Sequence, residues 1–267
     1  GFMIEGVQGP MARSVRDCAM FMDAMAAFDP NSPISYPGPK SSFQTAVIEA
    51  DTMPRIAFAP DLNGFAQVDD DMATHIAMAL DKINRYGAVV VETCPDFPNL
   101  EATYHTLRGA MWATAARRMP EAITQHFKKT LADNTAFGRA LTMDHIADAH
   151  LDRTIIYANM LAMFDDFDVL ACPVVGCMPH PQTTEWVDTV GGVQLSGYMD
   201  WLRFAFLATT TGLPAMSVPV GRDANGVPVG LQLIGKPRGE ADLLAAASMV
   251  ERVMGGPMTP IDPITPI

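Results

Sequence analysis

Hydrophobic positions along this chain alternate between helical and strand spacing for most of its length. Residues 14–29 carry apolar side chains at three- and four-residue intervals after a potential N-cap at Ser14, a pattern that predicts a helix. Asp29-Pro30 ends the pattern, because proline has no N–H to donate and restricts the residue before it. The proline-rich segment that follows, residues 30–53, is predicted to form a surface loop.

Residues 55–92 have the pattern of a parallel β-α-β unit. A short apolar run at 55–59 predicts a strand, and the aspartates at 69–71 suit the positive end of the next helix dipole. Gly87 fits the end of that helix, and the unbroken apolar run at 88–91 predicts a strand covered on both faces. No glycine fingerprint follows the first strand, so the unit does not indicate a dinucleotide site.

The rest of the chain continues the alternation. Residues 99–166 are predicted to be mostly helical, with breaks near Pro120 and at 134–138 and with a last helix that begins at Thr142. Asn225-Gly226 favours a hairpin between the last two predicted strands. The tail from Gly255 carries four prolines and is predicted to run over the surface. The other predicted elements are a strand at 168–172, a loop at 173–197, a helix at 198–210, strands at 215–220 and 227–234, and a helix at 239–254.

Composition excludes several classes of protein. Lys and Arg number 18 against 30 Asp and Glu, and the net charge of −12 argues against a nucleic-acid surface or an anionic-membrane binder. The apolar fraction of 49% excludes a disordered chain, and no apolar run is long enough to span a membrane. Four cysteines without a CxxC pair indicate buried, reduced thiols in a cytoplasmic protein.

The candidate chemical groups each have a structural alternative. None of the six histidines is paired at a helical zinc-binding spacing, so no metal site is predicted. Asp165, Asp166 and Asp168 could form an acidic site, but a solvated helix end is the favoured interpretation. Cys172 ends a predicted strand, where open α/β sheets place ligands, yet no basic residue near it in sequence would activate a thiolate. These residues alone give no convincing catalytic set.

Two stretches resemble the amidase signature family of serine hydrolases. The first reads Gly9-Pro-Met-Ala-Arg13-Ser14-Val15 and leads into a helix. The second reads Thr211-Gly-Leu-Pro-Ala-Met-Ser-Val-Pro-Val-Gly221, then Gly226-Val-Pro-Val-Gly-Leu-Gln-Leu-Ile-Gly235. Asp168-Val-Leu, running into Pro173, is similar to the strand that precedes the family's proline-rich loop. The order and spacing of these stretches agree with the family from residue 1 to about residue 254.

The resemblance implies an α/β fold in which a mixed β-sheet is flanked by helices, an α/β/α sandwich. Residues 1–267 would be its incomplete C-terminal portion, because the family's Gly/Ser-rich segment precedes the motif at Gly9. That segment surrounds the nucleophilic Ser, a second Ser and a Lys in the family, and the Ser41-Ser42 pair lacks its glycine-rich context. We therefore assign no catalytic residue to this chain, and the resemblance implies no metal and no cofactor.

The resemblance also implies an activity and its partners. The complete enzyme would hydrolyse a carboxamide to an acid plus ammonia or an amine, and this part would be inactive alone. Its partners would be a small amide substrate, the N-terminal half of the same fold and a second copy in a possible homodimer, without direct nucleic-acid or membrane binding. Two alternatives stay open: a non-catalytic binding or assembly protein of the same fold, and the A subunit of a glutamyl-tRNA amidotransferase. That amidotransferase component has an acid about ten residues before its Gly-Leu-Pro, where this chain has Leu202.

The predicted helix before Gly212 carries the candidate substrate contacts. Its polar and aromatic side chains suit the orientation of a small substrate, although an aromatic packing anchor with a surface ion pair is the structural alternative. The candidates are Tyr198, Asp200, Trp201 and Arg203. Ser217 and Gln232 alternate with apolar residues in the two strands that follow, so they could form a polar face toward a site or simply pack within the sheet.

Overall fold

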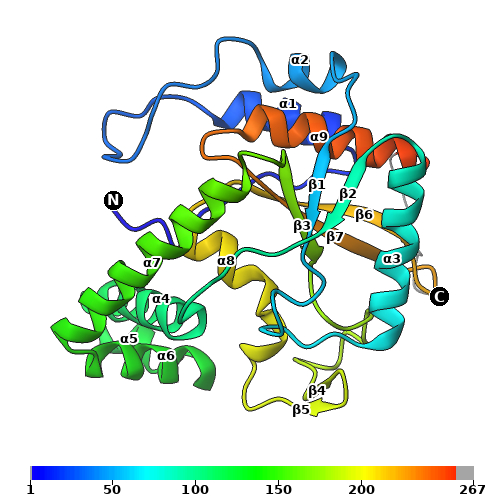
Figure 1. The fold of residues 1–267 in the computed structure, drawn as a ribbon. Coiled ribbons are helices and arrows are strands. Elements are labelled where there is room, and N and C mark those ends of the chain that lie inside the picture. Colours follow the sequence, from blue (N-terminus) through cyan, green and yellow to red (C-terminus); the bar gives the residue numbers. More distant parts are fainter. Residues whose placement is uncertain (1, 257–267) are drawn as a thin grey trace, which may run out of the picture.

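A five-stranded mixed sheet forms the centre of the computed structural model, which describes residues 2–256 (Figure 1). The strand order is β2-β1-β3-β7-β6. Strand β1 pairs in parallel with both β2 and β3, whereas β7 is antiparallel to β3 and to β6. This arrangement confirms the mixed sheet that the sequence predicts. The strands are β1 (Arg55–Phe58), β2 (Val89–Glu92), β3 (Val169–Pro173), β6 (Ala215–Arg222) and β7 (Pro228–Gly235).

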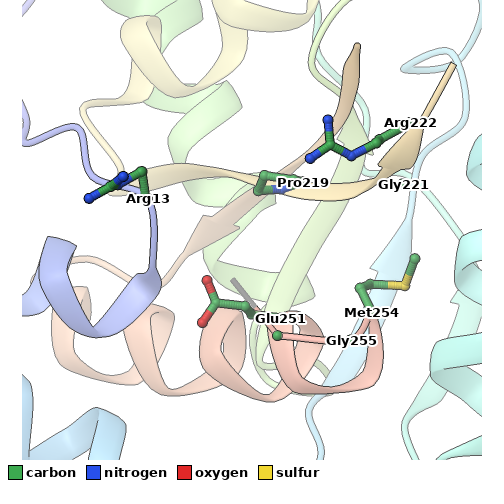
Figure 2. A pocket seen from close by; sticks show the side chains of 8 residues that line it. Arg13, Pro219, Gly221, Arg222, Glu251, Met254 and Gly255 are labelled. Carbon is green, nitrogen blue, oxygen red and sulfur yellow. The ribbon is translucent and has the colours of Figure 1, made fainter. Parts of the chain in front are cut away.

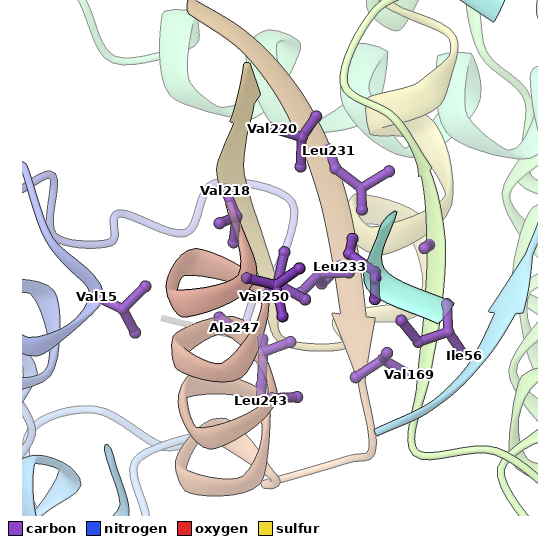
Figure 3. Packing of buried hydrophobic residues seen from close by; sticks show 14 of the residues in the cluster. Val15, Ile56, Val169, Val218, Val220, Leu231, Leu233, Leu243, Ala247 and Val250 are labelled. Atoms are coloured by element: carbon purple, nitrogen blue, oxygen red, sulfur yellow. The ribbon is translucent and has the colours of Figure 1, made fainter. Parts of the chain in front are cut away.

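Helices cover the two faces of this sheet and bury two separate apolar clusters. One face packs against α1 (Val15–Met25), α2 (Phe43–Ile48), α3 (Asp70–Arg85) and α9 (Glu240–Val253). Figure 3 shows α9 placing Leu243, Ala247 and Val250 against Val218 and Leu233 of the sheet. The other face packs against α4 (Leu100–Ala116), α7 (Met143–Met163) and α8 (Phe204–Thr211). The described part of the chain is therefore a three-layer α/β/α sandwich.

The remaining elements are short or lie beyond the sheet. Helices α5 (Glu121–Thr124) and α6 (Lys129–Ala140) join α4 to α7, and a 3-10 turn, η1 (Asp200–Leu202), precedes α8. A small hairpin lies within the predicted loop 173–197. Its two strands, β4 (Thr189–Val190) and β5 (Val193–Gln194), have two residues each. Among the described residues, no helix is both long enough and apolar enough to cross a membrane.

The β-α-β unit at 55–92 is confirmed, but the environment of its second strand is not the predicted one. Strand β2 lies at the edge of the sheet, where Val89 is 47% exposed and Val91 is 42% exposed. Val90, on the opposite face, packs into the cluster under α3. The strand is thus covered on one face only, because an unbroken apolar run cannot by itself distinguish a central strand from an edge strand.

The prediction of a loop over residues 30–53 is wrong at its end, where α2 forms. Ser42 caps this helix, with its Oγ accepting a hydrogen bond from Thr45 N at 3.1 Å. The Asp23 carboxylate accepts two more, from Phe43 N at 2.6 Å and from Gln44 N at 3.1 Å. A carboxylate from α1 therefore satisfies the free N–H groups of α2, a contact that local sequence does not reveal.

The predicted break at 134–138 is also wrong, since these residues lie inside α6. The glycine here serves close packing instead of ending the helix. A Cβ on Gly138 would lie 1.9 Å from the carbonyl oxygen of Gly109 in α4. The two glycines therefore let α4 and α6 approach each other more closely than side chains would allow.

Other predicted elements agree closely with the structure. The first helix begins after Ser14 but ends at Met25, four residues before the predicted end. The break at Pro120 is present, and Thr142 caps α7 through a capping box with His145. The hairpin of β6 and β7 is confirmed, with a register shift between Pro219 and Arg222. The predicted surface tail from Gly255 falls almost wholly on residues 257–267, outside the described residues.

Candidate functional site

A cleft of about 380 Å³ lies at the carboxyl end of β3. Met72 of α3, the segment 174–180, Trp201 of η1, Ser217 of β6 and residues 228–230 of β7 contribute to its lining. Strand ends are the usual position of ligand sites in α/β sheets, because the connecting segments diverge there. A volume of this size is within the range of small-molecule sites.

The lining of this cleft is apolar and rich in sulfur and aromatic groups. Met72, Cys177 and Met178 contribute sulfur, and His180 meets the Trp201 ring edge-on with ring centroids 5.5 Å apart. The indole Nε1 of Trp201 is buried and has no hydrogen-bond partner among the described residues. A buried donor without a partner costs about 1–3 kcal/mol.

Close packing between β6 and β7 shapes one wall. A Cβ on Gly230 would lie 2.7 Å from Ser217 Oγ and 2.8 Å from a methyl carbon of Val174. Ser217 therefore faces the cleft, as one interpretation of its alternating pattern predicts. Gln232 has the other role that the pattern allows. Its Nε2 donates to the carbonyl oxygen of Phe204 at 2.9 Å and to the Cys172 sulfur at 3.1 Å, and so ties α8 to the sheet.

Of the four predicted substrate contacts, Trp201 lines the cleft. Tyr198 has its hydroxyl within 2.8 Å of the donor Asn134 Nδ2 and 3.5 Å of Arg108 Nη2, and so contacts α6 and α4. The structure does not gather the four side chains around one space. Their roles toward a substrate stay predictions.

Asp200 and Arg203 form a connected polar network beside Trp201. The Asp200 carboxylate is 9% exposed and accepts hydrogen bonds from Ser196 N at 2.8 Å and Ser196 Oγ at 2.6 Å. Arg203 donates to Asp200 at 3.1 Å, to Glu101 at 2.8 Å and to the Phe65 carbonyl oxygen at 3.2 Å.

This network sets the direction of the pKa shift of Asp200. Burial alone would raise the pKa of its carboxyl group. The hydrogen bonds from Ser196 and the guanidinium of Arg203 outweigh that effect and hold the pKa of Asp200 below its ordinary value. Asp200 thereby joins the backbone at Ser196 and Gly197 to Arg203, the residues on either side of Trp201.

Cys172 is not placed for nucleophilic chemistry. Its side chain is fully buried, and burial raises the pKa of the thiol to about 12, although the hydrogen bond from Gln232 opposes this rise. Burial also raises the pKa of Cys18, Cys94 and Cys177, and all four cysteines are free. The thiolate is the reactive form of cysteine, so burial lowers the reactivity of these thiols.

The acidic cluster before β3 has a structural role at one position. Asp168 Oδ2 accepts a hydrogen bond from Arg55 N at 2.8 Å and so joins the starts of β3 and β1. Within residues 2–256, no group of three or more His, Cys, Asp or Glu side chains is arranged to hold a metal ion.

A second cleft, of about 400 Å³, lies where the N-terminal motif meets α9 (Figure 2). Arg13, Arg222 and Glu251 line it. Glu251 accepts a hydrogen bond from Val15 N at 2.9 Å, and Arg222 donates to the Gly226 carbonyl oxygen at 2.6 Å. Burial raises the pKa of Glu251. The motif residues thus anchor the start of α1 to α9.

Sequence reasoning missed most of the lining of the first cleft. Met72 belongs to the apolar face of α3, and segment 174–180 falls inside a predicted loop. One available signal was the proline- and glycine-bearing segment directly after the buried strand β3, because loops at strand ends form ligand sites in such sheets. The contribution of Met72 depends on how α3 packs over the sheet.

Comparisons with known proteins place these features in a family. The amidase family model matches residues 2–244. A putative amidase of Synechocystis sp. is 24% identical over 93% of this chain and 47% of its own length. The A subunit of the glutamyl-tRNA(Gln) amidotransferase of Gluconobacter oxydans is 27% identical over 91% of this chain and 53% of its own. A fatty acid amide hydrolase of Oryza sativa is 40% identical over 119 residues, which are 44% of this chain and 19% of that protein.

Solved structures agree with the fold. A bacterial aryl acylamidase of the amidase signature family superposes with a TM-score of 0.81 at 23% identity, covering 92% of this chain and 52% of that one. This chain spans about half the length of the relatives that it matches over most of its own length. Because the family model covers residues 2–244 and the three-layer fold agrees with that of a known member, this chain belongs to the amidase signature family.

Proposed function

We propose that this chain supplies the substrate-binding part of a serine-dependent amidase, which hydrolyses a carboxamide to an acid plus ammonia or an amine. The cleft at the carboxyl end of β3 carries the proposal, because it is a small-molecule-sized space lined by Trp201 in a member of the amidase family. The relatives are about twice as long as this chain, so the other half of the fold supplies the remaining walls of the site.

The chemistry is nucleophilic catalysis by a serine in that other half. The serine hydroxyl attacks the amide carbonyl, and a second serine and a lysine carry the proton to the leaving amine. Water then hydrolyses the acyl-enzyme. Backbone N–H groups stabilise the oxyanion that forms during each step.

Two features of the described residues support a nucleophile outside this chain. Neither of the two clefts includes a lysine among its lining residues. In the Ser41-Ser42 pair, Ser42 caps α2, which packs with α1 and α9 on the sheet face opposite α4, α7 and α8. A serine that serves as a helix cap has its oxygen committed to backbone N–H groups.

Exposed apolar residues support a surface on which the other half would pack. Phe2 is 81% exposed, Val7 is 79% exposed and Met11 is 92% exposed. Strand β6 pairs only with β7 among the described strands, which leaves its outer edge unpaired. Single exposed apolar residues are ordinary, but three of them within ten residues of the chain, together with an open strand edge, suit an interface.

Hydrolysis in trans tests the proposal. The 267-residue chain, with its intact mass confirmed, is incubated with a panel of simple amides and with a fluorophosphonate probe. We expect no turnover and no labelled serine from the chain alone, and hydrolysis once a segment that supplies the N-terminal half of the fold is added. Removal of the catalytic residues of serine hydrolases lowers kcat by several powers of ten, so the difference is easily measured.

Two results would contradict the proposal in different ways. Turnover by the chain alone with covalent labelling of Ser41 or Ser42 would place the nucleophile in this chain. Failure of every complementing N-terminal half that folds and binds the chain would favour a binding or assembly protein.

A further inference from the structure

We propose that the cleft at the carboxyl end of β3 selects the uncharged, apolar acyl or aryl portion of an amide, and that it rejects amides of free amino acids such as glutamine. This inference rests on the proposed function and names its substrate class. It starts from the side chains that line the cleft. They are Met72, Val174, Val175, Cys177, Met178, Pro179, His180, Trp201, Ser217, Pro228 and Val229, together with Gly230.

The lining contains no Asp, Glu, Lys or Arg among the described residues. A ligand with an α-ammonium and an α-carboxylate would lose hydration here and would find no Asp, Glu, Lys or Arg partner in the part of the lining that this chain provides. The penalty for an unpaired buried ion is several kcal/mol, which exceeds what apolar contacts of a small ligand return. An uncharged apolar group loses nothing comparable.

The charged side chains on either side of Trp201 are already paired with each other. Asp200 and Arg203 flank Trp201, but Asp200 accepts hydrogen bonds from Ser196, Gly197 and Arg203. The Arg203 guanidinium donates hydrogen bonds to Asp200, to Glu101 and to the Phe65 carbonyl oxygen. Recruiting either group to hold an amino acid would break this network and leave the partner charge unpaired.

Positive features of the lining match an apolar ligand. The unbranched side chains of Met72 and Met178 adapt to irregular shapes and make favourable contacts with aromatic rings. The ring of Trp201 offers a flat apolar surface, and its indole N–H is buried without a partner among the described residues.

Methionine-methyl NMR on the intact 267-residue chain tests ligand choice without requiring catalysis. The chain is labelled with [methyl-13C]methionine and titrated with phenylacetamide, hexanamide and L-glutamine. We expect saturable shifts of the Met72 and Met178 methyl signals with the two apolar amides and no shift with glutamine. Met143 is 79% exposed on α7 and provides the internal control that stays unchanged.

A charge placed in the lining provides the matched variant. Met178→Glu should weaken binding of phenylacetamide at least tenfold, since the new carboxylate must be buried beside the ligand or keep water in the cleft. Met143→Glu adds the same charge on an exposed surface and should leave the affinity unchanged. Circular dichroism of both variants separates lost binding from lost folding, and Val175→Asp repeats the test at a second wall position.

The outcomes separate this inference from the proposed function. Glutamine binding as strong as that of the apolar amides, or shifts that do not saturate with any apolar amide, would overturn the substrate class. Hydrolysis of glutamine in preference to apolar amides by the complemented enzyme would overturn it while leaving the amidase proposal intact. Binding of apolar amides without any hydrolysis after complementation would overturn the amidase proposal and leave the ligand class standing.

Discussion

Trp201 and its neighbours show how single residues divide between structure and site. Trp201 lines the cleft, whereas Asp200 and Arg203 hold each other and the adjacent backbone. The polar network therefore supports the position of the aromatic ring, and the ring meets the ligand space.

The contribution of Trp201 to selectivity is measurable in the complemented enzyme. Trp201→Ala should change the ratio of kcat/KM between bulky and small apolar amides. The change should correspond to about 1–3 kcal/mol of transition-state free energy, the range for contacts in an apolar pocket. Trp112→Ala, on α4, is the matched tryptophan control and should leave that ratio unchanged. An equal loss for all amides, together with a lower melting temperature, would assign Trp201 to packing instead.

The Asp200 network should make stability depend on pH in a defined direction. The folded pKa of Asp200 lies below its ordinary value, so the ionised carboxylate stabilises the fold above about pH 4, and this stabilisation is lost as the pH falls through the folded pKa. We expect Asp200→Asn to lower the free energy of unfolding by about 1–3 kcal/mol at pH 7, because it removes a charged acceptor from Ser196 and Arg203.

Urea unfolding of both proteins at pH 7 and near pH 3 measures this difference. The difference in the free energy of unfolding between wild type and Asp200→Asn should be smaller at the lower pH. Asp133→Asn is the control, since Asp133 forms an exposed helical pair with Lys129 and such surface pairs contribute little. If the difference in the free energy of unfolding stays constant with pH, Asp200 contributes through packing and not through its charge.

At the scale of elements, contacts between distant segments set several boundaries. Helix α2 begins where Asp23 of α1 meets its first N–H groups, and α6 continues through Gly138 because α4 packs directly on it. The capping box at Thr142 is a local signal, and it sets the start of α7 as predicted. The local sequence therefore predicts a helix end where short-range hydrogen bonds define it. The other helix ends depend on contacts between distant segments.

Gly138 offers a test in which two effects have opposite signs. Alanine is favoured over glycine by about 0.5–1 kcal/mol inside a helix. Its Cβ here would lie 1.9 Å from the Gly109 carbonyl oxygen, so α4 and α6 would have to separate. We expect Gly138→Ala to destabilise the protein by about 1–3 kcal/mol, as overpacking does.

Thermal and urea unfolding measure the effect of Gly138→Ala. The control is Asp133→Ala, at an exposed site in the same helix. Asp133→Ala should change stability little, because its ion pair with Lys129 is exposed. Stabilisation by Gly138→Ala would mean that the two helices are not in close contact.

At the scale of the whole molecule, the sheet has two edges of different character. Strand β2 ends the sheet on one side with exposed Val89 and Val91, and β6 ends it on the other. Pro219 lies within β6, as suits an edge strand, because proline cannot donate to a neighbouring strand.

Self-association is the expected consequence for the 267-residue chain on its own. An unpaired strand with exposed apolar neighbours can pair with another copy. Sedimentation velocity should show a concentration-dependent increase in mass, and Ala215→Lys on β6 should reduce it, because charge on an edge strand opposes pairing. Val91→Lys on β2 is the matched variant at the opposite edge. If only Val91→Lys reduces self-association, the interface lies at β2 and not at β6. A chain that is monomeric at all concentrations would contradict the prediction.

The sequence by itself determined the parts of this protein that depend on neighbours along the chain. Periodic apolar positions placed α3 and α9, Asn225-Gly226 marked the β6-β7 hairpin, and the motif at Gly9 indicated the family that the comparisons show. Only the tertiary structure decided that β2 is an edge strand, that the 134–138 segment is helical and that Met72 joins Trp201 at one cleft. The physical reason is range: turns, caps and periodicity act over a few residues, whereas a cleft and a strand's exposure depend on which distant segments pack against each other.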